Sequence, residues 1–300
     1  MRTAALTMVA MLAFATNSIL ARLALSSSNI DPLAFTGIRL VSGAAVLAFI
    51  ALFRQNPEER PRLAGTGSWA GAASLLIYAT AFSIAYVMVG AGPGALILFA
   101  SVQIGMVTWA IAKGDRPALL EWLGMGIALA ALVYLVSPGL SAPPLHGALL
   151  MAVAGLAWGA YSLVGRGSRS PLADTAGNFI RCAPIGAVLM VAGFAFLRPN
   201  ALGLVYATAS GAVASGLGYI IWYGVLPKLT RTAAAVVQLT VPAIAALGGV
   251  IFIGESLSGR LLVAMAGIVG GVSLALLAAE RRRRGMIAVD RADEPRARDT

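Results

Sequence analysis

The chain has 300 residues, of which 59% are hydrophobic and only 11% are charged, and its formal net charge is +10. A water-soluble protein of this length needs far more charge on its surface, so the composition excludes an ordinary soluble domain and is typical of a polytopic membrane protein. The single cysteine, Cys182, lies inside an apolar run, which excludes a disulfide framework and a cysteine metal cluster.

Apolar segments follow one another along almost the whole chain, separated by short connections with turn signals such as "NIDP" and "SPGLSAPP". Because a helix needs about 20 mostly apolar residues to cross a bilayer, these segments predict transmembrane helices. The first segment follows the basic residue Arg2 and so resembles a secretory signal peptide. Because it continues to Leu25, which is long enough to span the membrane, we expect it to be a transmembrane helix that is not cleaved. In chain order the ten predicted spans are 3–24, 33–53, 69–89, 93–113, 118–137, 144–165, 175–197, 203–226, 232–253 and 260–280.

The distribution of basic residues predicts the orientation of these spans. If the N-terminus is cytoplasmic, seventeen of the twenty-two Lys and Arg residues fall in cytoplasmic regions, seven of them after Glu280. Such an excess is the rule for cytoplasmic loops. We therefore expect both termini on the cytoplasmic side of a bacterial-type inner (plasma) membrane, with residues 281–300 as a basic, disordered tail. The anionic inner leaflet accounts for the positive charge, so no nucleic-acid partner is expected.

Residues 1–140 and 141–280 contain matching segments, which predicts two repeats of five spans each. "FATNSILARLA" resembles "WGAYSLVGRGS", and "DPLAFTGIRLVSGAAVL" resembles "SPLADTAGNFIRCAPIGAVL". Since five is odd, the second repeat enters the membrane from the opposite side, as in the inverted repeats of many secondary transporters, which place a cavity near the bilayer midplane. The matched pairs are Phe14 with Trp158, Arg22 with Arg166, Arg39 with Arg181, Tyr86 with Tyr223, and Asp115 with Glu255.

The second half contains the most specific pattern, "YIIWYGVLPKLTRTAAAVVQLTVPAIAALGGVIFIGES", with an aromatic helix, a central Leu-x-x-Pro and a terminal Gly-Glu. Together with "PLAFTGIRL", it resembles the EamA type of the drug/metabolite transporter (DMT) superfamily over about residues 5–280. Within that superfamily the chain is most similar to the YddG-type exporters of aromatic and neutral amino acids. The first half departs from the pattern, because Val102 stands at the position equivalent to Pro242 and Gly-Asp replaces Gly-Glu.

The resemblance implies an all-α fold of ten transmembrane helices and a function in the export of small metabolites. Aromatic and neutral amino acids are the expected substrates. The resemblance also implies alternating access through a central cavity lined by spans 1, 3, 4, 6, 8 and 9, with no cofactor. Efflux of drugs, nucleosides or sugars by the same fold stays open as the alternative, because one fold carries many functions.

Polar and aromatic side chains at membrane depth are the candidates for substrate binding, since polar groups there are costly. Amides can bond a carboxylate or an ammonium group, and aromatic rings can stack on apolar groups or attract a cation. Packing between helices is the alternative role for each of them. The candidates are Asn17, Tyr78, Phe82, Tyr86, Gln103, Trp158, Tyr161, Tyr219, Trp222 and Gln238.

Two arginines and one proline are predicted to have structural roles. Arg39 and Arg181 occupy equivalent positions, which favours bonds to carbonyls at helix ends or snorkelling over substrate binding. Pro242 removes a backbone donor one turn after Gln238 and is predicted to act as a hinge or to form a static kink.

Acidic residues occur only at the ends of spans, and Asn17 stands in the first span, where small proton-coupled multidrug exporters of this superfamily carry a glutamate. Proton antiport through a carboxylate is therefore disfavoured. The chain has one histidine, one cysteine and no acidic residue in the middle of a span, so it lacks a catalytic or metal-binding set, and an intramembrane enzyme is a remote alternative. A channel is not indicated either, because the sequence contains no selectivity-filter motif. The expected partners are a small-molecule substrate and the lipid bilayer. The stripe Gly267-x-x-x-Gly271 can pack within one chain or between two chains, which predicts a monomer or a weak homodimer.

Overall fold

The computed structural model describes residues 2–53, 66–112, 118–137, 142–165, 168, 170–228, 237–238 and 240–293, and all regular secondary structure within these residues is helical. Within the described residues, seven helical segments are long and apolar enough to cross a membrane, and three shorter apolar ones accompany them, Ala91–Met106, Leu119–Leu135 and Thr240–Ile253. The elements are α1 (Arg2–Ser26), α2 (Pro32–Leu52), α3 (Trp69–Met88), α4 (Ala91–Ala112), α5 (Leu119–Val136), α6 (Leu145–Gly165), α7 (Pro171–Phe196), α8 (Ala201–Ala209), η2 (Ser210–Leu217), α9 (Gly218–Val225), η3 (Leu226–Lys228), α11 (Thr240–Gly248), η4 (Gly249–Ile253) and α12 (Gly259–Asp293).

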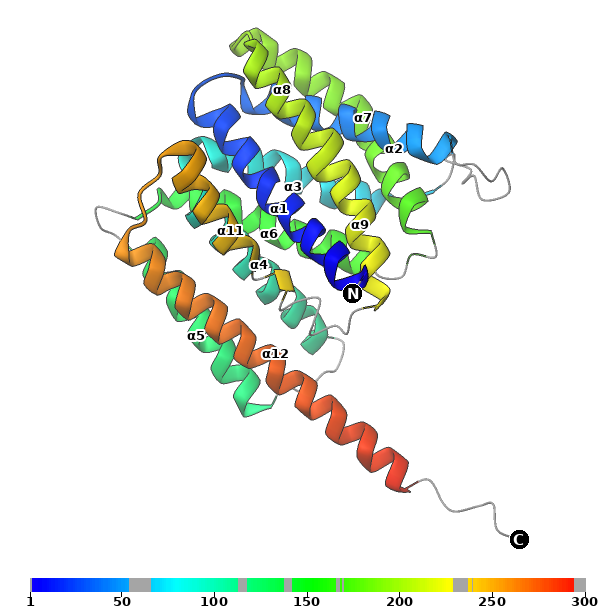
Figure 1. Cartoon of the computed structure of the whole chain (residues 1–300), viewed down its shortest axis with the longest axis vertical. Coiled ribbons are helices and arrows are strands. Elements are labelled where there is room, and N and C mark those ends of the chain that lie inside the picture. The colour runs from blue at the N-terminus through cyan, green and yellow to red at the C-terminus, as the bar shows by residue number, and fades with distance from the viewer. Residues whose placement is uncertain are drawn as a thin grey trace.

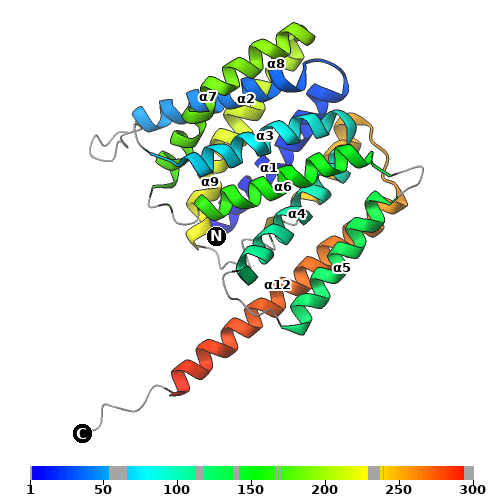
Figure 2. The ribbon, with the colours of Figure 1, turned by 180° about the vertical axis from the view of Figure 1, so that it is seen from behind.

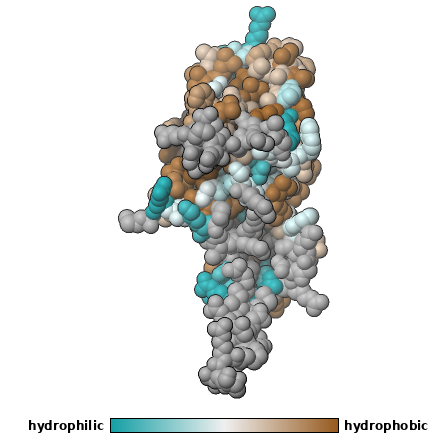
Figure 3. Space-filling model, turned by 90° about the vertical axis from the view of Figure 1, so that its right-hand side faces the viewer, coloured by the Kyte–Doolittle hydropathy of each residue, from teal (hydrophilic) through white to brown (hydrophobic). Residues whose placement is uncertain are grey.

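The outer surface of the bundle is strongly apolar. Large side chains such as Phe196 and Ile251 are 76% and 71% exposed. Figure 3 shows mostly hydrophobic side chains over the body of the bundle, with hydrophilic ones at its margins. In water a protein with such a surface would aggregate, whereas lipid solvates the surface. The prediction of an all-α, multi-pass membrane protein is therefore confirmed.

α1 lies in the middle of the bundle, where it contacts α3, α4, α8, α9 and α11. At one side of the bundle α2 packs against α7, and at the other α5 packs against α12 as a separate pair (Figures 1 and 2). α6 packs on both α3 and α4. These contacts surround α1 with helices from the whole length of the chain, and the buried core of the protein lies there.

Helix starts follow the turn signals of the sequence. Asp31 caps α2 by accepting a hydrogen bond from the Leu33 N–H at 2.7 Å, and Asn200 caps α8 by accepting one from the Gly203 N–H at 2.8 Å. Such side-chain acceptors satisfy backbone donors that have no partner within the helix. The cap also brings two connections together, because the Asn200 N–H donates to the carbonyl of Asn29 at 3.0 Å.

Glycines allow the close helix pairs. A methyl group added at Gly271 would lie 2.6 Å from the carbonyl oxygen of Gly124, and one added at Gly267 would lie 2.6 Å from Ala131 Cβ. The predicted small-residue stripe therefore packs within the chain, against α5. Small residues let two backbones approach closely where no hydrophobic force between helices is available in lipid.

Replacing Gly271 with leucine is expected to destabilise the folded protein by about 1–3 kcal/mol, because the added side chain would overpack the α5–α12 contact. The measurement is the thermal unfolding midpoint of the purified protein in detergent. Gly270→Leu is the matched control, since Gly270 lies next to it on α12 and a Cβ there meets no atom within 4 Å. Equal midpoints for the two variants would contradict this packing.

α12 is longer than the sequence indicates. The predicted last span ends at 280 and a disordered tail follows, whereas the helix continues to Asp293, and residues 294–300 lie outside the described part. Alanine, arginine and glutamate favour helix, and extending an existing helix avoids the cost of nucleation. Arg282 Nε also donates to Glu121 Oε1 at 2.8 Å, which ties this extension to the start of α5.

The eighth predicted span, 203–226, is one continuous helix of changing type. α8 passes into η2, a π-helical segment, and then into α9. π segments are rare and occur often at functional sites. The glycine at position 211 lets η2 lie directly on α2, because a Cβ there would be 2.3 Å from the carbonyl oxygen of Arg39.

Candidate functional site

A cavity lies at the centre of the bundle, between α1, α3, α4, α6 and α9. The centre of a water molecule can reach only about 20 Å³ of it. The cavity is therefore narrow in this conformation, and its walls must separate to admit anything much larger than water. The lining residues are Phe14, Asn17, Ser18, Tyr78, Phe82, Leu98, Phe99, Trp158 and Tyr219.

Trp158 lies at the centre of the aromatic cluster that forms the cavity wall. Its ring centroid is 4.8 Å from that of Tyr219 and 5.1 Å from that of Tyr78. Phe14 and Tyr161 follow at 5.7 Å each. Tilted and edge-on rings of this kind attract each other through their quadrupoles. The Trp158 Nε1–H is buried and has no hydrogen-bond partner among the described residues, so it is available to donate a hydrogen bond to a ligand.

Helical spacing brings these side chains to one place. Tyr78 and Phe82 are four residues apart on α3, and Phe14 and Ser18 are four residues apart on α1, so each pair shares a helix face. The Tyr78 and Phe82 rings are 5.3 Å apart. Two helices therefore present a pair of side chains each to the same cavity.

Asn17 joins three elements through a buried amide. Ser210 Oγ on η2 donates to Asn17 Oδ1 at 2.6 Å, and Asn17 Nδ2 donates to the Tyr78 hydroxyl at 3.4 Å. An amide nitrogen has two protons, so one N–H of Asn17 remains for a further acceptor. The amide thus fixes the cavity wall and keeps a donor for a ligand.

Arg39 lies directly behind this wall and is only 1% exposed. Its Nε donates to Ser215 Oγ at 3.0 Å, and its Nη2 donates to the hydroxyls of Tyr78 and Tyr219 at 3.1 and 3.2 Å. The guanidinium carbon is 5.0 Å from the ring centroids of both Tyr78 and Phe82. Arg39 therefore differs from the expectation of a charge at a helix end, because it lies deep in α2 and contacts residues that line the cavity.

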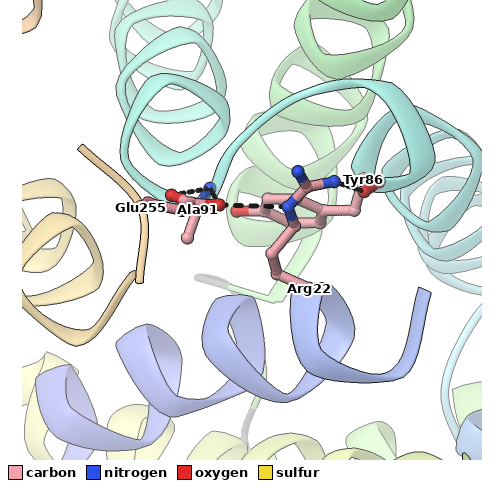
Figure 4. A network of polar contacts seen from close by, with 4 residues as sticks. All are labelled: Arg22, Tyr86, Ala91 and Glu255. Carbon is pink, nitrogen blue, oxygen red and sulfur yellow. Dashed lines mark hydrogen bonds and ion pairs between the residues drawn. The ribbon is translucent and has the colours of Figure 1, made fainter. Parts of the chain in front are cut away.

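A second polar network joins α1, α3 and α4 to the segment before α12 (Figure 4). Both carboxylate oxygens of Glu255 accept from the Ala91 N–H, at 3.0 and 2.9 Å, and Oε1 also accepts from Arg22 Nε at 3.0 Å. Arg22 Nη1 donates to the carbonyl of Tyr86 at 2.9 Å. Arg22 and Glu255 also line a wide pocket, of which the centre of a water molecule can reach about 350 Å³. Asp115, the predicted equivalent of Glu255, lies outside the described residues.

The structure brings together five of the ten predicted substrate-binding residues. Those that line the cavity are Asn17, Tyr78, Phe82, Trp158 and Tyr219.

The other five predicted residues are buried but do not line the cavity. Tyr86 and Trp222 form the layer behind it, with ring centroids 4.6 Å from Phe82 and 5.8 Å from Phe14 respectively. Tyr161 contacts Trp158 and lines a separate small pocket. Gln103 and Gln238 are 4% and 5% exposed and are not among the lining residues.

Two further predicted residues lie outside the cavity. Arg181 donates to the carbonyl oxygens of Thr66 and Gly177, and its guanidinium lies over the Trp69 ring at 5.6 Å. Pro242 is buried in the first turn of α11. Because 229–236 and 239 are outside the described residues, its role as hinge or static kink stays a prediction.

Four lining residues were not among the predicted ones, namely Phe14, Ser18, Leu98 and Phe99. A signal existed for two of them, because Phe14 matches Trp158 in the repeat and Ser18 lies on the same helix face as Phe14. Leu98 and Phe99 carry no such signal, since an apolar residue facing a cavity looks the same in sequence as one facing lipid.

A bundle of apolar helices around a narrow cavity with aromatic, amide and hydroxyl groups defines a membrane transporter of small molecules. The chain belongs to the EamA-like transporter family, whose model matches residues 1–137 and again residues 145–277.

Relatives in bacteria extend over most of the chain. An uncharacterized protein of Pseudomonas aeruginosa is 49% identical over 275 residues, which cover 92% of this chain and 94% of that protein. The threonine/homoserine exporter RhtA of Salmonella typhimurium is 29% identical over 248 residues, 78% of either chain. The uncharacterized transporter YwfM of Bacillus subtilis is 28% identical over 280 residues, 87% of this chain and 89% of that one.

One solved crystal structure has the same fold. The protein is 23% identical in sequence, and the superposition covers 91% of this chain and 98% of that one with a TM-score of 0.63. Likeness at this level of identity concerns the fold alone.

Proposed function

We propose that the protein is a secondary transporter that exports amino acids, with aromatic and neutral ones preferred, or similar small amphipathic metabolites, across the bacterial inner membrane. The observation that carries this proposal is the central cavity, where aromatic rings of α3, α6 and α9 face the amide of Asn17. Rings of this kind suit an apolar side chain, and amide, hydroxyl and indole donors suit a carboxylate. The name of the relative RhtA, a threonine/homoserine exporter, supports amino acids as the substrate class.

The proposed mechanism is alternating access between two inverted repeats of five spans. Helix contacts support it, because equivalent helices pack on each other, α2 on α7 and α5 on α12. Likewise α6 packs on α3 and α4, while its equivalent α1 packs on the equivalents of those two, α9 and α11. The two separate family matches agree with this division. The N-terminus and the C-terminal end of α12 also point toward the same end of the bundle, as expected for two cytoplasmic termini (Figures 1 and 2).

Liposomes containing the purified protein should release preloaded radiolabelled amino acids faster than protein-free liposomes, with phenylalanine and other aromatic amino acids released fastest. The same assay with nucleosides, sugars and cationic dyes tests efflux of other metabolites or of drugs, the alternative functions of this fold. If none of the twenty amino acids is released above the protein-free control, the amino-acid assignment is wrong. Release of a dye or a nucleoside alone would then favour the corresponding alternative.

A further inference from the structure

The guanidinium of Arg39 is a buried positive charge, and among the residues that the structure describes it has no carboxylate partner. Its contacts within the described part of the chain are hydroxyl groups and aromatic rings, none of which carries a negative charge at neutral pH. Its Nη1 has no hydrogen-bond partner there at all. Burying an ionised group is costly unless it is paired and fully hydrogen-bonded. A protein retains such an arrangement most readily when something else supplies the negative charge.

Two of the residues whose hydroxyls accept hydrogen bonds from Arg39 also line the cavity. Tyr78 and Tyr219 both line it, and each hydroxyl accepts a hydrogen bond from Nη2. A phenol that accepts a bond still has its own proton to donate. Bonds in a chain polarise one another, so a phenol that accepts from a guanidinium becomes a stronger donor. These polarised hydroxyls belong to two residues of one cavity wall, with a positive charge behind them.

We propose that the hydroxyls of Tyr78 and Tyr219 bind the carboxylate of a ligand in the central cavity, and that Arg39 acts through them as a positioning residue that supplies the compensating charge. The ligand class is a small organic acid, including the carboxylate end of an amino acid. This inference rests on the proposed transport function for its biological sense, but carboxylate binding can be measured without transport. It assigns Arg39 a role in ligand recognition beyond helix packing.

The geometry also gives the ligand an orientation. The carboxylate would lie toward α3 and α9, where the two hydroxyls are, while the apolar end would face the rings of Phe14, Phe99 and Trp158. Charge-assisted hydrogen bonds are about twice as strong as neutral ones, so loss of the ligand's charge should be felt more than loss of its ammonium group. Recognition should therefore depend on the acid group.

The test compares three ligands that share one aromatic ring, namely phenylalanine, 3-phenylpropionate and phenylalaninamide. Binding is measured with the purified full-length protein by the ligand-induced shift in thermal unfolding, titrated to an apparent Kd. The wild type should bind both carboxylates about tenfold or more tightly than the amide, which is the effect expected for hydrogen bonds to a charged group. Equal binding of all three, or no binding of either carboxylate, would overturn the inference.

Variants separate recognition from a merely structural role. Tyr78→Phe and Tyr219→Phe remove one hydroxyl each and should reduce the preference for carboxylate over amide by about three- to tenfold. Arg39→Gln should abolish the preference, while Arg39→Lys, which keeps the charge, should restore part of it. Tyr134→Phe on α5 is the control, because Tyr134 is 44% exposed and is not among the lining residues, and the preference of this variant should equal that of the wild type. A preference unchanged in both phenylalanine variants would overturn the inference, and this holds even where Arg39→Gln does not fold.

Failure of this inference and failure of the proposed function give different results. Liposomes that release phenylalanine and phenylalaninamide equally well would leave amino-acid export standing and exclude the carboxylate site. Tight binding of 3-phenylpropionate without release of any amino acid would support the site and contradict the amino-acid assignment.

Discussion

Trp158→Ala is expected to reduce transport by at least about tenfold, because it removes the ring around which the cavity wall is packed. Phe14, Tyr78, Tyr161 and Tyr219 all contact this ring. Each aromatic pair contributes about 0.5–1.5 kcal/mol beyond the buried area, so the loss of four also lowers the stability of the folded protein. The measurement is the initial rate of amino-acid release from liposomes, normalised to folded protein recovered as a single peak in size-exclusion chromatography.

Two further variants make the Trp158 result interpretable. Trp158→Phe keeps an aromatic ring and should retain an intermediate rate. Trp122→Ala removes a tryptophan that is 51% exposed on α5 and should transport at the wild-type rate. A folded Trp158→Ala protein with unchanged release would mean that the substrate does not pass through this cavity.

Glu255→Ala is expected to loosen the end of the bundle where Arg22, Ala91 and Glu255 meet. The change removes a hydrogen-bond acceptor from the start of α4 and leaves Arg22 without its carboxylate, which should cost about 2–3 kcal/mol. Every 1.4 kcal/mol corresponds to about a tenfold change in an equilibrium constant, so the fraction of protein molecules that are open at this end should rise at least about tenfold. The measurement is the rate at which a membrane-impermeant maleimide labels Ser18→Cys in the cavity, in a background with Cys182→Ser.

A variant with the two charges exchanged separates the ion pair of Glu255 from its hydrogen bonds to the Ala91 N–H. Arg22→Glu combined with Glu255→Arg restores an ion pair but gives the Ala91 N–H no carboxylate from position 255, so the labelling rate should fall only part of the way back. Arg284→Ala is the control, because its pair with Glu280 has an arginine that is 76% exposed, and exposed pairs contribute little. If Glu255→Ala labels at the rate of its parent, the network does not hold this end closed.

Long apolar segments made most of the fold predictable. The described helices fall within a few residues of the predicted spans for α1 to α6, because hydropathy and turn signals act locally. Two features were not predictable, each for a physical reason. The extension of α12 is held against α5 by the salt bridge between Arg282 and Glu121, a contact between residues far apart in the sequence that no local pattern indicates. The π geometry of η2 and η4 depends on packing against neighbouring helices, and single residues carry no signal for it.

The candidate site was predictable where a polar or aromatic side chain interrupts an apolar helix. Asn17 and Trp158 stand out in this way, and the structure has both in the cavity wall. Gln103 and Gln238 stand out equally, yet they lie elsewhere, because the direction in which a side chain points depends on how each helix is rotated in the bundle. The surroundings of Arg39 were not predictable for a related reason. Its match with Arg181 suggested one shared role, whereas the two arginines have different surroundings.

The π turn of η2 also has a consequence for the spacing of residues along the chain. Ser210 contacts Asn17 and Ser215 contacts Arg39, and these two serines are five residues apart. In an α-helix a separation of five residues corresponds to a rotation of about 140°, so the two hydroxyls would point in different directions. A π turn instead bonds each residue to the fifth one along, which places such residues above one another. The buried hydroxyl pair therefore depends on the number of residues between the serines as much as on their identity, and an insertion or deletion there acts on the site differently from any substitution.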